Sequence, residues 1–168
     1  FHHSDETLSA EGIPFYLFHH QKGVEILRAE IPKEHSGAIN SRYLMKETTE
    51  QTVIDAKFGV HPQAGMAIYI TYVENDQYHS AWYHLSGNLI EKQQFAPLEG
   101  TIIDTYPERQ SYLLMRDESL FLHSPKEEKT LRLRHQVENS QCRIHKRGVA
   151  CFQNGEWKIL HSYASSTE

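Results

Sequence analysis

The chain has 168 residues, with 17 basic and 22 acidic side chains and a formal net charge of -5. This length suits one domain of about 100–200 residues, and the eighteen aromatic side chains argue against intrinsic disorder. No stretch approaches the ~18 consecutive apolar residues of a membrane-spanning helix, so we expect no membrane insertion of this segment. The chain begins at Phe1 rather than Met, which favours a processed, exported product.

Short runs of apolar and aromatic residues between turn signals predict strands rather than helices. The connections are too short for parallel pairing, which needs a crossover of about a dozen residues or more. One segment fits both structures: Thr48 can cap a helix with Ile54 and Phe58 four residues apart, but Ile54, Ala56 and Phe58 also alternate as in a strand. The predicted strands cover 14–19, 24–31, 67–73, 78–85, 89–95, 111–115, 119–123, 130–134 and 156–163, the last after an Asn154-Gly155 turn.

We therefore expect a single all-β domain over residues 1–168, built of antiparallel meanders, with residues 1–10 as a mobile terminus. The two cysteines support a hairpin near the end of the chain. With a four-residue loop from His145 to Gly148, Ile144 faces Val149 and Cys142 faces Cys151 on one side of the hairpin. We predict a Cys142–Cys151 disulfide and hence an oxidising compartment, periplasmic or extracellular; the alternative is a pair of reduced, buried thiols.

A weak internal repeat follows from Pro14, Pro62 and Pro107, which are 48 and 45 residues apart and each precede an apolar strand. The segments His61-Pro62-Gln63-Ala64-Gly65-Met66-Ala67-Ile68-Tyr69-Ile70 and Ala81-Trp82-Tyr83-His84-Leu85-Ser86-Gly87-Asn88 resemble the turn and strands of TolB-like β-propeller blades, over about residues 60–134. The resemblance implies a propeller-like fold in the bacterial periplasm, where such blades mediate protein contacts, including those of membrane-tethered regulators. A β-barrel or sandwich is the alternative fold.

Catalytic and metal-binding motifs are missing from the sequence. The twelve histidines include no His-x-His or His-Glu-x-x-His spacing, and the chain has no Cys-x-x-Cys, Gly-x-Ser-x-Gly or glycine-rich phosphate loop. We expect no metal and no cofactor. The alternative is a hydrolase or metal-dependent enzyme whose histidines and carboxylates converge only in the fold, for which we single out His61, His79 and His84.

Exposed aromatic residues are the feature that best fits binding. Tyr78, Trp82, Tyr83 and His84 stand together among His and Ser, where amphipathic rings often meet a partner or ligand. The basic segment 126–147 fits a solvated strand face, since Leu131-Arg132-Leu133-Arg134 alternates, and the net acidity disfavours nucleic acid. The sequence predicts a non-catalytic, extracytoplasmic recognition or sensor module for a protein partner or small effector. The resemblance to TolB-like blades implies, as one setting, the outer part of a bacterial membrane-tethered regulatory system.

Overall fold

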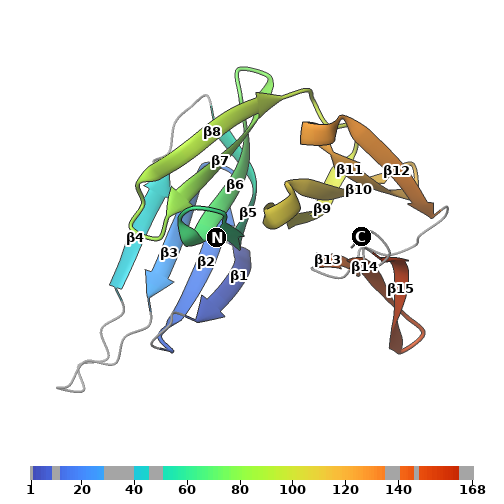
Figure 1. Cartoon of the computed structure of the whole chain (residues 1–168), viewed down its shortest axis with the longest axis horizontal. Helices are drawn as coiled ribbons and strands as arrows, with labels where there is room; N and C mark the ends of the chain where they lie inside the picture. Colours follow the sequence, from blue (N-terminus) through green and yellow to red (C-terminus); the bar gives the residue numbers. More distant parts are fainter. Residues whose placement is uncertain are drawn as a thin grey trace. The chain divides into compact units, whose positions relative to one another are not determined.

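The computed structural model describes residues 2–8, 12–28, 40–45, 51–134, 141–145 and 148–162. These residues form fifteen strands and two single-turn 3₁₀ helices, which confirms the all-β prediction (Figure 1). The chain divides into two compact units, residues 1–96 and 97–168, which we describe separately as unit 1 and unit 2. Among the residues described, no helix is long and apolar enough to cross a membrane.

Unit 1 consists of two four-stranded antiparallel sheets, each a simple meander in chain order. Residues 2–8, expected to be a mobile terminus, form the first strand and pair with the second. Segment 51–61 is a strand, while Thr48 and the end of the predicted strand 24–31 lie outside the described residues. The first sheet contains β1 (His2–Leu8), β2 (Pro14–His20), β3 (Gly23–Arg28) and β4 (Asn40–Met45); the second contains β5 (Gln51–His61), β6 (Gly65–Glu74), β7 (Gln77–His84) and β8 (Leu89–Phe95).

Unit 2 consists of a four-stranded and a three-stranded antiparallel meander. All of these strands except β9 are predicted from the sequence, and their described ends agree with the structure to within one or two residues. The predicted end of the last strand, Tyr163, lies outside the described residues. The four-stranded sheet contains β9 (Thr101–Tyr106), β10 (Ser111–Arg116), β11 (Ser119–Ser124) and β12 (Lys129–Arg134), with 3₁₀ turns η1 (Pro107–Arg109) and η2 (Pro125–Glu127); the three-stranded sheet contains β13 (Cys142–His145), β14 (Gly148–Gln153) and β15 (Glu156–Ser162).

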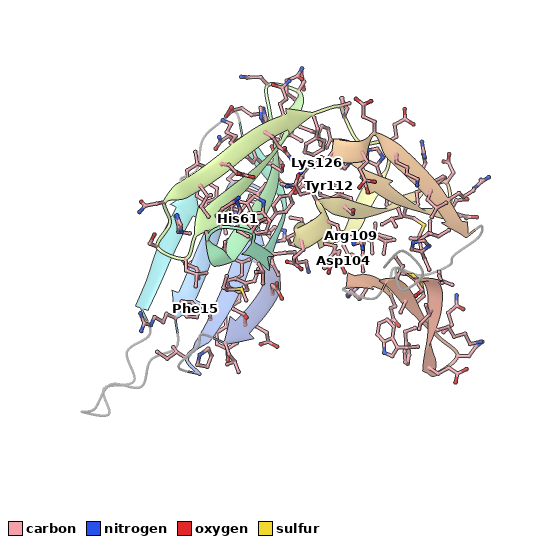
Figure 2. The ribbon with its side chains drawn as sticks, in the orientation of Figure 1. Phe15, His61, Asp104, Arg109, Tyr112 and Lys126 are labelled. Carbon is pink, nitrogen blue, oxygen red and sulfur yellow. A yellow bond between two sulfur atoms is a disulfide. The ribbon has the colours of Figure 1, made fainter. Side chains whose placement is uncertain are left out.

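The Cys142–Cys151 disulfide is confirmed, and it joins β13 to β14 in the predicted register (Figure 2). The backbone N–H of Phe152 donates to the carbonyl of Gln141 at 2.9 Å, so Cys142 and Cys151 form the adjacent pair without hydrogen bonds. Side chains approach most closely at such pairs, which brings the two sulfurs together. The predicted four-residue loop is shorter in the structure, because His145 pairs with Gly148; residues 146–147 lie outside the described part.

Each unit has an apolar core between its two sheets. Alternation along the strands supplies these side chains, since successive residues of a strand point to opposite faces of its sheet. Strand β6 is buried on both faces from Ala67 to Tyr72, as its continuous apolar run predicts. The core of unit 1 includes Phe15, Leu17, Val24, Ile26, Phe58, Ile68 and Ile70; that of unit 2 includes Leu113, Leu120, Leu122, Ile144, Val149 and the disulfide.

A structural repeat unites the three four-stranded sheets. In the first strand of each, a β-bulge is followed directly by an aspartate: Asp5, Asp55 and Asp104. In unit 1 the carboxylate of Asp5 accepts a hydrogen bond from the backbone N–H of Phe58 on β5, at 2.8 Å. In unit 2 the carboxylate of Asp104 accepts one from the backbone N–H of Ile144 on β13, at 2.9 Å. Each unit therefore ties the first strand of one sheet to the first strand of the next.

Candidate functional site

The four predicted binding residues do not form one surface, because all four lie on β7 and alternate along it. Tyr78, Trp82 and His84 share one face, where Tyr78 packs against Phe95 with ring centroids 5.9 Å apart. Tyr83 is on the opposite face and packs against the core of unit 1. Only His84 of these four is exposed, so the structure gives this set no common binding surface.

Trp82 is the most deeply buried of the four, with 3% of its surface exposed. Its ring contacts those of His61 and Tyr69 at centroid distances of 5.3 and 5.0 Å. The indole Nε1 is buried and has no hydrogen-bond partner among the described residues. Trp82 therefore acts as a packing residue of the β5–β8 sheet.

His61, labelled in Figure 2, stabilises the turn between β5 and β6. Its Nδ1 accepts hydrogen bonds from the backbone N–H groups of Gln63 and Ala64, both at 3.2 Å. Nε2 therefore carries the ring hydrogen in the neutral form, and it lies 3.5 Å from the carboxylate of Glu91. In this arrangement His61 takes the role of a turn-capping side chain at the start of the Pro62 turn.

The three histidines singled out for an enzyme site do not share one face. His79 stacks on Tyr72 at 5.1 Å, on the face opposite to that of His61 and Trp82. Within the part of the chain that the structure describes, no group of three or more His, Cys, Asp or Glu side chains is placed to hold a metal ion. The enzyme alternative stays a prediction.

Polar groups of unit 1 gather instead around Tyr83. Its pKa is raised mainly by burial and then by electrostatic interaction with Tyr72, while Lys92 lowers it and Glu74 raises it. A hydrogen bond with Tyr72 raises the pKa of Lys92, whose ammonium also lies 5.8 Å from the Tyr72 ring centroid. These contacts link β6, β7 and β8 across the sheet, and they keep Lys92 charged.

Unit 2 contains a pocket of about 280 Å³ on the β9–β12 sheet. The alternation of β10 and β11 places Leu114 and His123 on this face, while Leu113 and Leu122 point into the core. The segment before β9 supplies the other wall. The pocket is lined by Pro97, Leu98, Glu99, Leu114, Arg116, His123 and Thr130.

A glycine permits the close approach of this wall. Gly100 has φ +124°, in the region that favours glycine, and a Cβ atom there would lie 2.8 Å from the carbonyl oxygen of Met115. Because Gly100 has no side chain, the backbone can pass close to β10 and bring Leu98 and Glu99 to the pocket.

One cation dominates the pocket. The guanidinium of Arg116 pairs with the carboxylate of Glu99 and lies 4.3 Å from the ring centroid of Phe121. The Glu99 side chain is 80% exposed, so solvent weakens this pair and the carboxylate can move away. Stacking on Phe121 holds the guanidinium in place, because the ring face attracts a cation.

His123 adds a neutral polar group to the same pocket. Its Nδ1 and the hydroxyl of Thr130 are hydrogen-bonded at 2.7 Å across β11 and β12. Burial lowers the pKa of His123 below 6.5, and the charge of Arg116 lowers it further. The imidazole is therefore uncharged at neutral pH, and Arg116 is the group that attracts an anion.

This arrangement can bind a small molecule with an anionic group and an apolar body. Arginine pairs well with carboxylates, and the apolar side of the ligand would lie against Leu98 and Leu114. None of the pocket residues is among the binding residues predicted from the sequence. The available signal was faint: charged or polar residues interrupt apolar strands at Arg116 and His123, and only the fold shows that these residues are neighbours.

No protein-family model matches the chain, and no curated protein matches it.

Proposed function

We propose that this protein is a non-catalytic recognition or sensor module that works outside the cytoplasm and binds a small anionic effector in the unit 2 pocket. The observation that carries the proposal is the pocket itself, with one stacked guanidinium above an apolar wall. A binding site of this kind needs neither a nucleophile nor a metal.

We expect the anionic group of the effector to take the place of Glu99 beside Arg116, which favours anionic over neutral ligands. In the free protein the carboxylate of Glu99 neutralises Arg116, and an effector carboxylate replaces it. His123 is neutral and adds no charge, so the positive charge of the pocket comes from Arg116, with the guanidinium of Arg132 also 5.7 Å from the centroid of the Phe121 ring. The volume limits the ligand to a small molecule.

The compartment and the wider architecture are proposals supported by separate observations. The disulfide supports an oxidising compartment, periplasmic or extracellular. Consecutive meander sheets with a repeated bulge and aspartate support a propeller-like arrangement, in line with the resemblance to TolB-like blades. Such a module suits the outer part of a bacterial membrane-tethered regulatory system.

The test compares two probes that differ in charge, benzoate and benzamide, by chemical-shift perturbation of the backbone amides of the oxidised protein. We expect benzoate to shift amides around Leu98, Arg116 and His123, and benzamide to shift them at least about tenfold less at equal concentration. The Arg116→Gln variant should lose the benzoate response. The matched control, Lys126→Gln, removes one exposed positive charge from unit 2 outside the pocket and should keep it.

Two results would count against the proposal. Equal responses to benzoate and benzamide would show that the charge of the ligand does not determine binding. Benzoate shifts located away from the pocket, or unaffected by Arg116→Gln, would show that the pocket is not the binding site.

A further inference from the structure

The last sheet of unit 2 presents an apolar face to solvent. Phe152 pairs with Trp157 and Ala150 pairs with Ile159, so these side chains lie on one side of β14 and β15. Arg143 pairs with Ala150 and completes this side on β13. We call the side formed by Arg143, Phe152, Trp157 and Ile159 the basic apolar face.

This face is exposed although it is built from large side chains. Phe152, Trp157 and Ile159 are 38%, 56% and 74% exposed, and the rings of Phe152 and Trp157 touch at a centroid distance of 5.5 Å. The other side of the same sheet carries the disulfide and Val149 into the core of unit 2. Contiguous exposed aromatic and aliphatic groups of this kind mark interaction surfaces.

The first sheet of unit 1 also carries aromatic residues on the side away from the core, where they are half-buried. Phe15 and Leu17 point into the core, so Tyr16 and Phe18 lie on the other side of β2. There Tyr16 pairs with Leu27 and Glu6, while Phe18 pairs with Glu25. We call the side formed by Glu6, Tyr16, Phe18, Glu25 and Leu27 the acidic apolar face.

The charges of the two faces are complementary. Glu6 and Glu25 lie beside the aromatic residues of the acidic apolar face, and Arg143 lies beside those of the basic apolar face. The imbalance extends to the units: residues 1–96 contain twelve acidic and seven basic side chains, whereas residues 97–168 contain ten of each. Such complementarity selects partners and orients them on approach.

The packing inside each unit indicates what covers these faces. In both units one sheet packs face to face on the next, with an aspartate of one first strand bound to the backbone of the following first strand. We propose that the basic apolar face of one copy packs on the acidic apolar face of a second copy, which continues this sheet-on-sheet packing between molecules. A contact between two different faces is heterologous, so each copy offers one face of each kind.

Self-association measured by sedimentation velocity tests the proposal. We expect the oxidised protein to associate as its concentration rises from about 1 µM to about 200 µM. Ile159→Lys should weaken the association at least about tenfold, because it places a charge at the centre of the contact. Leu89→Lys is the matched control, since Leu89 is 52% exposed on β8 outside both faces, and it should associate as the native protein does.

Charge-reversal substitutions, one on each face, identify which two faces contact each other. Arg143→Glu and Glu25→Arg should each weaken self-association. A mixture of the two variants should associate again, because the glutamate introduced at position 143 of one variant then meets the arginine introduced at position 25 of the other. Circular dichroism of each variant confirms that loss of association is not loss of folding.

A protein that stays monomeric over the whole concentration range overturns the proposal. Association that survives Ile159→Lys, or that is not restored by mixing the exchanged variants, overturns the assignment of the faces. Binding of a monomer to vesicles of phosphatidylcholine and phosphatidylglycerol, lost in Ile159→Lys, would assign the basic apolar face to a lipid surface instead.

Discussion

Reduction of the disulfide should destabilise unit 2 by an amount set by the loop it closes. Cys142 and Cys151 are nine positions apart, so the bond closes a loop of ten residues. On the chain-entropy account, removing this constraint favours the unfolded state by about 2.7 kcal/mol. Both cysteines are buried, and the two thiols left by reduction remain in the apolar core without new polar groups. The entropy of the unfolded loop should therefore account for most of the change.

Amide hydrogen exchange measured by NMR, with and without a phosphine reductant, gives this energy directly. A loss of about 2.7 kcal/mol corresponds to about a hundredfold faster exchange of the slowest amides of β14. The amides of β6 in unit 1 serve as an internal reference and should change little. The double variant Cys142→Ala/Cys151→Ala should show no response to the reductant.

A change smaller than about threefold in β14 would refute this reasoning. It would mean that the unfolded chain keeps the two cysteines close together without the bond, so that the loop entropy is not released. An equal acceleration in the Cys-free variant would show that the reductant acts elsewhere.

Three further predictions concern the pocket and the link between sheets. Since the folded pKa of His123 lies below its unfolded value of 6.5, the unfolded state binds the proton more tightly; the free energy of unfolding should fall as pH decreases from 6.5 through the lower folded pKa, and urea titrations should show a weaker slope in His123→Gln. Asp104→Ala leaves the backbone N–H of Ile144 buried without this acceptor and should cost about 1–3 kcal/mol in the same titrations, whereas Glu127→Ala at an exposed position should cost little. Gly100→Ala forces a Cβ atom against the Met115 carbonyl and should displace the pocket wall, so benzoate binding measured by NMR should weaken at least about tenfold; unchanged binding would contradict the role given to Gly100.

Most strands and turns could be predicted from the sequence, but β1, β4, β5 and β9 were not predicted as strands. All four carry a β-bulge, as do the predicted strands β8, β12 and β15. Strand β1 coincides with the expected mobile terminus, β5 with the segment that fits both helix and strand, and β4 and β9 with no predicted strand. In β1, β5 and β9 the bulge lies next to Asp5, Asp55 and Asp104. A bulge inserts one residue and interrupts the alternation on which strand prediction depends. The aspartates at intervals of 50 and 49 residues were the signal that could have identified all three.

The all-β class, the antiparallel meanders and the disulfide follow from the amino-acid order alone, because they depend on alternation, turn residues and the register of one hairpin. The amino-acid order alone does not show which face of each strand another sheet covers. That choice buried Trp82, left Trp157 exposed and brought Glu99, Arg116 and His123 to one pocket. Burial and proximity of distant residues depend on how sheets pack, and this packing is specified only when the whole chain has folded.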